Sequence, residues 1–196
     1  MSNYGYWNDP LFIDRIARSL KQNHVIAGTS DTVLGLLAPL TSQGKQAIDA
    51  IKVRERKPYL VLVSSLAKAK EFSDSFSDSK VQSLAKKYWP GPLTLVLPAK
   101  EDIPDFICSS ERTIALRIPD HPGLLQLLAS FDGLFSTSAN LSGQPVPDSI
   151  EQLDPMIKQK VELLVDDRQR KQNQPSTIVA YSNGALTVMR QGAIKI

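Results

Sequence analysis

The stretch LFSTSANLSGQP, residues 134–145, carries the strongest indication of fold and function in this chain. The apolar pair Leu134 and Phe135 is typical of a buried strand, and the eight residues that follow from Ser136 are mostly small or polar. Small residues let a ligand approach the backbone, and hydroxyl and backbone N–H groups at a strand end suit oxyanions. A Ser-rich turn that binds nothing is the alternative interpretation. The stretch alone therefore does not distinguish a ligand site from a plain turn, and the rest of the sequence is needed to decide.

The composition predicts a single globular domain over residues 1–196 with an ordinary apolar core, because 42% of the residues are hydrophobic. Cys108 is the only cysteine, which excludes an intramolecular disulfide and favours a reducing compartment. The polar N-terminus has no signal-peptide pattern, and no apolar run is long enough to span a membrane. We therefore expect a cytoplasmic protein without membrane contact. The net charge of +3 does not by itself indicate nucleic-acid binding.

Helical and strand patterns alternate along the chain, which predicts an α/β domain with a twisted, mixed β-sheet. Asp9 and Pro10 are typical of a helix start, and Ser42 is expected to cap a second helix. The turn Asn183-Gly184 predicts a hairpin that returns the chain toward its starting point. Helices are expected at 10–22, 42–52, 65–72, 80–88 and from 122, and strands at 24–27, 60–63, 93–97, 113–118, 134–136, 162–165, 177–181 and 185–189.

Further blocks accompany the opening stretch in a fixed order along the chain. They read TSDTVLG at 29–35, KVRERKP at 52–58, YWPGPLTLVLPA at 88–99, TIALRIPDHP at 113–122 and PSTIV at 175–179, with Arg190 near the end. In this order and spacing the set resembles the YrdC/Sua5 family of threonylcarbamoyl-AMP synthases, from about Val25 to Arg190. The resemblance implies a twisted mixed sheet flanked by helices, with a large concave cleft.

The resemblance also implies an ATP site. The family's KxR motif matches Lys52 and Arg54, which we expect to act as catalytic residues by contacting the phosphates. A solvated helix end is the alternative for this basic run. The interval between Arg54 and Lys57 is shorter here than in relatives. The expected ATP-binding residues are Lys52, Arg54, Lys57, Thr113, Ser138, Asn140 and Arg190.

A threonine site follows from the same resemblance. Arg117 matches the arginine that holds the threonine carboxylate, and a planar guanidinium suits bidentate recognition of a carboxylate. The block at 29–35 departs from the family pattern because Thr29 replaces proline, Ser30 replaces threonine and Leu34 replaces tyrosine. The expected threonine-binding residues are Ser30, Thr32, Arg117, Ser136 and Ser176.

The implied reaction joins L-threonine, bicarbonate and ATP into threonylcarbamoyl-AMP and pyrophosphate. A transferase complex would then use this intermediate to modify an adenosine beside the tRNA anticodon, so direct tRNA binding is expected to be weak or transient. Mg²⁺ is expected to arrive with ATP, without a dedicated metal site or a tightly bound cofactor. No His/Cys spacing of a zinc site is present in the sequence.

Two other functions remain open at this stage. An RNA-binding module could use a basic cleft, although no aromatic residues are interleaved with the basic run for base stacking. A carbamoyl-transfer domain like that in hydrogenase-maturation carbamoyltransferases is the second alternative. In those proteins the domain is fused to acylphosphatase-like and zinc-finger segments, and this sequence has no CxxC motif.

Overall fold

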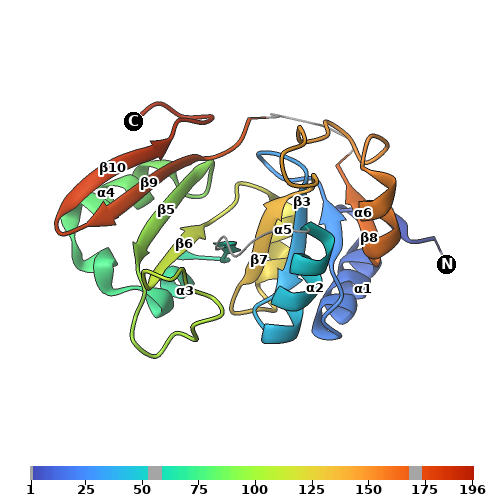
Figure 1. Cartoon of the computed structure of the whole chain (residues 1–196), viewed down its shortest axis with the longest axis horizontal. Coiled ribbons are helices and arrows are strands. Elements are labelled where there is room, and N and C mark those ends of the chain that lie inside the picture. The colour runs from blue at the N-terminus through green and yellow to red at the C-terminus, as the bar shows by residue number, and fades with distance from the viewer. Residues whose placement is uncertain (1, 53–58, 168–173) are drawn as a thin grey trace.

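The structure is a computed structural model that describes residues 2–52, 59–167 and 174–196. These residues contain ten strands that form one mixed sheet (Figure 1). The strands are β1 (Tyr4–Tyr6), β2 (Ile26–Gly28), β3 (Gly35–Pro39), β4 (Leu60–Leu62), β5 (Leu93–Pro98), β6 (Thr113–Arg117), β7 (Leu134–Ser138), β8 (Leu163–Asp166), β9 (Thr177–Ser182) and β10 (Ala185–Arg190).

The sheet order is β1-β8-β2-β3-β7-β4-β6-β5-β9-β10, so most neighbours in space are distant in sequence. β8 lies between β1 and β2 and is parallel to both. β7 lies between β3 and β4 and is antiparallel to both. The expected α/β fold with a twisted mixed sheet is therefore confirmed.

Helices cover both faces of the sheet. The short 3₁₀ helix η1 (Asp74–Ser77) precedes one of them, α4, and buries Phe76. The α-helices are α1 (Pro10–Lys21), α2 (Ser42–Lys52), α3 (Leu66–Phe72), α4 (Ser79–Tyr88), α5 (Pro122–Leu128) and α6 (Pro155–Lys160).

Alternating residues of the strands divide the core into two layers, because successive side chains point to opposite faces of a sheet. On β2, Ile26 packs in the layer with α1 and α5, whereas its neighbour Ala27 packs in the layer with α2, α3, α4 and α6. Leu37 and Leu36 on β3 divide in the same way. The face covered by α1 and α5 is only partly covered, and this leaves room for a cavity.

Local signals explain how most helices start. Asp9 accepts hydrogen bonds from the backbone N–H groups of Leu11 and Phe12, as its position before Pro10 predicts. The expected cap of α2 is wrong by one residue: Thr41 Oγ1, and not Ser42, accepts the hydrogen bond from Gly44 N at 2.9 Å. The helix thus starts directly after the turn that ends β3.

Four elements have no counterpart in the sequence-based expectation, namely β1, β3, η1 and α6. β3 lies inside an apolar run that follows the block at 29–35, and its five residues are all buried. The hairpin β9–β10 is confirmed, with positive φ angles of 51° at Asn183 and 76° at Gly184.

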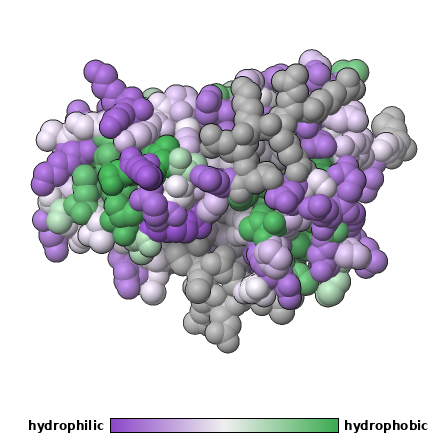
Figure 2. Space-filling view, turned by 90° about the horizontal axis from the view of Figure 1, so that it is seen from above, coloured by the Kyte–Doolittle hydropathy of each residue, from purple (hydrophilic) through white to green (hydrophobic). Residues whose placement is uncertain are grey.

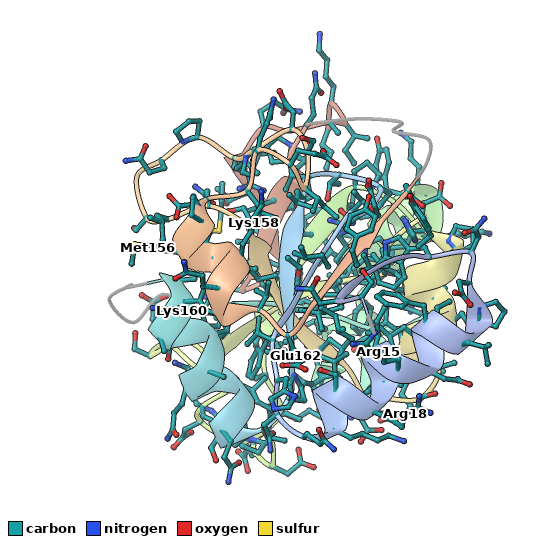
Figure 3. All side chains as sticks on the ribbon, turned by 90° about the vertical axis from the view of Figure 1, so that its right-hand side faces the viewer. Arg15, Arg18, Met156, Lys158, Lys160 and Glu162 are labelled. Atoms are coloured by element: carbon teal, nitrogen blue, oxygen red, sulfur yellow. The ribbon has the colours of Figure 1, made fainter. Side chains whose placement is uncertain are left out.

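The two ends of the sheet expose different chemistry. At the β10 end, Leu186, Val188 and Met189 are exposed, and the apolar patch on the left of Figure 2 overlies this end of the molecule. At the opposite end, basic side chains from α1 and α6 lie around Glu162 (Figure 3). Lys160 on α6 donates to Ala50 O at 2.8 Å and so connects α6 to α2. Among the described helices, none combines the length and the apolar character that crossing a bilayer needs.

Candidate functional site

A cavity of about 620 Å³ lies on the partly covered face of the sheet. Its floor consists of alternate residues from six adjacent strands, which is what one face of a pleated sheet supplies. The pairs that face the cavity are Gly35 and Leu37 on β3, Ser136 and Ser138 on β7, Leu60 and Leu62 on β4, Ala115 and Arg117 on β6, Thr94 and Val96 on β5, and Ser176 and Ile178 at β9.

Three of the four hydroxyl residues of the opening stretch, Ser136, Thr137 and Ser138, belong to the sheet. The sequence predicted that the strand ends at Ser136, but β7 continues to Ser138 because Gly35 and Leu36 of β3 pair with Ser138 and Thr137. Strand geometry then places Ser136 and Ser138 on the cavity face. Ser136 and Ser138 thus line the cavity, while the expected strand end is wrong.

Lys52 anchors the chain that follows β7. Its side chain is only 3% exposed, so the alternative of a solvated lysine at a helix end is wrong. The ammonium donates to Ser138 O at 2.7 Å, to Asn140 O, and to Asn140 Oδ1 at 3.1 Å. Ser138 Oγ donates to the same Oδ1 at 2.5 Å. Lys52, Ser138 and Asn140 therefore form one connected polar group at the edge of the cavity.

Arg117 is the most deeply buried cation in the cavity wall, at 4% exposure. Its Nη1 donates to Thr32 Oγ1 at 2.8 Å, and its Nη2 pairs with Asp31 Oδ1. Asp31 Oδ2 also accepts a hydrogen bond from Asp120 N at 3.0 Å. The Nε–H of Arg117 has no hydrogen-bond partner among the described atoms. The loop before β3 thus holds the guanidinium through Thr32 and Asp31, and the loop after β6 holds Asp31 in turn.

A second arginine reaches the cavity from β10. The register of the hairpin shifts between Val188 and Arg190, so Met189 is an extra residue opposite β9. Such a bulge changes the direction of the side chains that follow it. Arg190 donates from Nη2 to Ser176 O at 2.8 Å, and Ser176 Oγ lies 2.8 Å from Thr94 Oγ1. The hairpin therefore returns the chain as predicted and brings Arg190 to Ser176.

The two arginines bring two positive charges to the cavity, and Asp31 pairs with one of them, that of Arg117. Burial lowers the pKa of Arg117, the Asp31 carboxylate opposes this shift, and the positive charge of Arg190 lowers the pKa further. Burial also lowers the pKa of Arg190. An arginine stays protonated at neutral pH despite such shifts. Two cations that affect each other across a partly apolar cavity favour an anionic ligand, because the ligand relieves their repulsion.

The structure brings most of the expected residues to this cavity and leaves others beside it. Lys52 and Asn140 do not line the cavity but contact Ser138, which does. Thr113 shares the cavity face of β6 with Ala115 and Arg117, but it lies at the far end of the strand and its Oγ1 is 2.8 Å from Ser109 Oγ. Arg54 and Lys57 lie outside the described residues. The expected residues that line the cavity are Ser30, Thr32, Arg117, Ser136, Ser138, Ser176 and Arg190.

Sequence reasoning missed four polar residues of the site, namely Thr29, Asp31, Thr94 and Thr137. Asp31 was part of a quoted block but received no role, although a buried arginine needs a nearby anion. Thr94 alternates with apolar residues on β5, and such a pattern does not distinguish a core threonine from a ligand contact. Thr29 lines the cavity, and its Oγ1 is buried without a hydrogen-bond partner among the described atoms.

Comparison with known proteins identifies the family. The model of the Sua5/YciO/YrdC family, described as "Telomere recombination", matches residues 18–192. The chain belongs to the Sua5/YciO/YrdC family. The resemblance drawn from the sequence blocks is thus confirmed, and the cavity described above is a cavity of a Sua5/YciO/YrdC domain.

Relatives in this family bear the name of one activity. The chain is 32% identical over 174 residues to a putative threonylcarbamoyl-AMP synthase of Methanocaldococcus jannaschii, covering 88% of this chain and 81% of that protein. It is also 32% identical to the threonylcarbamoyl-AMP synthase of Vibrio cholerae, covering 89% and 94%. It spans about half of the Bacillus subtilis enzyme, with 31% identity over 95% of this chain and 55% of that protein.

Solved structures of the family share the fold. A crystal structure of Pyrococcus abyssi Sua5 complexed with L-threonine superposes with a TM-score of 0.87 at 28% identity, over 94% of this chain and 55% of that one. Escherichia coli YciO, at 20% identity and a TM-score of 0.82, supports the fold alone. HypF, at 18% identity and a TM-score of 0.78, also supports the fold alone, over 92% of this chain and 29% of that one.

Proposed function

We propose that this chain is a threonylcarbamoyl-AMP synthase, which converts L-threonine, bicarbonate and ATP into threonylcarbamoyl-AMP and pyrophosphate. The observation that carries the proposal is the pair Arg117 and Arg190 at one cavity whose other polar groups are mainly hydroxyls. The relatives' shared name supports the same reaction. Two anionic substrates, a carboxylate and a triphosphate, match two separate guanidinium groups.

We place threonine in the part of the cavity formed by β6 and the loop before β3. Arg117 would bind its carboxylate through the donors left over from its bonds to Thr32 and Asp31, including the unpartnered Nε–H. Because the guanidinium is held from two sides, it needs little reorganisation when the substrate binds. Ser30, Thr32, Ser136 and Ser176 are the remaining proposed threonine contacts.

We place ATP toward the end of β7 and the hairpin β9–β10. Arg190 supplies charge from β10, and Ser138 supplies a hydroxyl to the cavity. In the described structure Lys52 donates to the backbone of this segment, so its main contribution here is to fix Ser138 and Asn140. The proposed ATP contacts are Lys52, Arg54, Lys57, Thr113, Ser138, Asn140 and Arg190.

The proposed chemistry depends mainly on positioning and charge. The amine of threonine and bicarbonate form a carbamate with loss of one water molecule, and a carbamate oxygen attacks the α-phosphorus as pyrophosphate leaves. The cations would stabilise negative charge that develops on the phosphate oxygens, which is the usual basis of such transfers. Neither histidine is among the residues lining this cavity, so we assign no side chain as a general base.

The substrate's metal and the downstream partners are part of the same proposal. Mg²⁺ would enter bound to the phosphates of ATP. A transferase complex would receive the intermediate and transfer it to tRNA, which need not enter this protein. Free tRNA is then expected to bind only in the non-specific range, with a Kd on the order of 10⁻⁴ to 10⁻⁶ M at physiological salt.

The test is release of pyrophosphate from Mg-ATP, measured with each substrate omitted in turn. Turnover is expected only when both L-threonine and bicarbonate are present. Equal release without threonine, or no release with all three substrates, would contradict the proposal. An RNA-binding module would instead bind tRNA tightly whether or not ATP and threonine saturate the cavity. Filter retention at about 150 mM salt, near the physiological ionic strength, distinguishes the two.

A further inference from the structure

A second cavity, of about 570 Å³, lies on the opposite side of the sheet from the candidate active site. Its walls come from α3, α4 and the ends of the parallel strands β4 and β6. Crevices at the carboxyl ends of parallel strands are common ligand sites in α/β proteins. The lining residues are Ser64, Ser65, Leu66, Lys70, Phe76, Gln82, Ala85, Lys86, Trp89, Pro90 and Ile118.

Two helices turn one face each toward this cavity. On α4, Gln82 and Lys86 are four residues apart, and Trp89 follows three residues after Lys86, so one stripe of the helix lines the cavity. On α3, Leu66 and Lys70 are likewise four residues apart. Each helix therefore contributes a lysine from its last turn and an apolar side chain.

The inner wall is apolar and aromatic. The rings of Phe76 and Trp89 lie 5.9 Å apart between centroids, at an angle of 49°. Trp89 Nε1 donates to Leu93 O at 2.6 Å, which fixes the indole ring. Ile118, at 4% exposure, completes this wall. A wall of this kind suits a flat apolar group that packs against fixed rings.

Lys70 and Lys86 are the two charged residues that line this cavity. Within the described part of the chain, neither Lys70 nor Lys86 forms an ion pair with a carboxylate. The neighbouring Lys68, by contrast, contacts Glu71 at 3.2 Å and Asp132 at 2.8 Å. Lys86 and Lys87 are both exposed, and of the two only Lys86 lines this cavity.

We propose that this cavity is a second binding site for a small molecule that combines a flat apolar body with a carboxylate, sulfonate or phosphate group. The apolar body packs against Trp89 and Phe76, and the anionic group lies between Lys70 and Lys86. The volume is in the usual range for small-molecule sites, roughly 300–1,000 Å³. The proposal does not depend on the reaction assigned to the other cavity.

The site is separate from the candidate active site but shares backbone with it. Ile118 directly follows Arg117, and Gly91 N, next to Pro90, donates to Ile118 O at 2.9 Å. Val63 N donates to Arg117 O at 3.0 Å, just before Ser64. Arg117 faces one cavity and Ile118 the other, because adjacent residues of an extended segment point to opposite sides.

The test uses 2-naphthoate as the anionic aromatic probe and 2-naphthylmethanol as its neutral counterpart. The chain has two tryptophans, so the indole N–H signals of Trp89 and Trp7 can be followed separately by ¹H–¹⁵N NMR in the intact protein. Naphthoate is expected to shift the Trp89 signal and to leave that of Trp7, which is bonded to Thr29 O, in place. The neutral alcohol is expected to bind more weakly.

Variants and competition make the test specific. Lys70→Gln combined with Lys86→Gln is expected to weaken naphthoate binding about fivefold or more, as loss of exposed ionic contacts predicts. Lys87→Gln, next in sequence but outside the cavity, is the matched control and should leave affinity unchanged. Saturating ATP and threonine should not displace the probe.

Each opposite result would overturn the proposal. These results are an unshifted Trp89 signal at millimolar naphthoate, equal affinity for the neutral alcohol, and equal effects of the double variant and of Lys87→Gln. Displacement of naphthoate by ATP and threonine would likewise place the probe in the other cavity.

Discussion

Replacing Lys52 with methionine tests the polar group that holds the chain after β7. The substitution keeps an unbranched side chain as long as the lysine stem but removes the ammonium, which donates to three oxygen atoms of Ser138 and Asn140. Two backbone carbonyls then lose a charged donor in a nearly dry environment. Each buried unsatisfied group costs roughly 1–3 kcal/mol, and removing the buried charge offsets part of this, so we expect a net loss of about 3 kcal/mol.

Thermal unfolding followed by circular dichroism measures this effect. For a chain of this size, 3 kcal/mol corresponds to a fall in Tm of about 6–12 °C. Lys160→Met is the matched control, because Lys160 also donates to a backbone carbonyl, that of Ala50, but at the exposed surface. The control is expected to change stability by no more than about 0.5 kcal/mol. A Lys52→Met protein that melts within about 2 °C of wild type would refute the reasoning.

Three further predictions concern single contacts. Arg117→Ala should lower the affinity for threonine in the presence of ATP by about tenfold or more, measured by calorimetric titration; unchanged affinity would contradict the assignment. Gly28→Ala should lower the free energy of unfolding in urea by about 1–3 kcal/mol, since a Cβ there lies 2.6 Å from Val165 Cγ1; a wild-type midpoint would argue against tight packing. The pKa of Asp78 is lowered mainly by the hydrogen bond from Tyr181, so this contact stabilises the fold above the unfolded pKa and is lost as pH falls through the folded pKa. Tyr181→Phe should raise the Asp78 pKa in a carboxyl NMR titration, and an unmoved titration would disprove this cause.

The sequence predicted local structure best where a few adjacent residues decide it. Asp9 before Pro10 starts α1, and Asn183-Gly184 turns the last hairpin, because capping and positive φ angles are properties of the residues themselves. The extent of β7, by contrast, could not be predicted from its own residues. Ser136–Ser138 have weak strand character alone, and only the neighbouring strands β3 and β4 make them part of the sheet.

The candidate site was predictable as a set of residues but not as a set of contacts. The ordered blocks contain Arg117 and Ser176, and the structure places both of them, together with Arg190, at one cavity. Nothing in the sequence indicates that Asp31 pairs with Arg117, since the two are far apart in sequence and their contact depends on the strand order. The burial of Lys52 was missed for the same reason, because the carbonyl groups that it binds follow a strand much later in the chain.

The position of β8 has a consequence for the synthesis of the protein. β8 is parallel to β1 on one side and to β2 on the other, so these two early strands have no partner at that position until residues 163–166 have been made. A growing chain therefore exposes two open strand edges while most of its apolar residues are already outside the ribosome. Such edges favour association between chains, and domains with many long-range strand pairs fold slowly. The edges of β1 and β2 are thus covered only once β8 has been synthesised. A delay in translation before residue 163 is therefore expected to promote aggregation of the nascent chain.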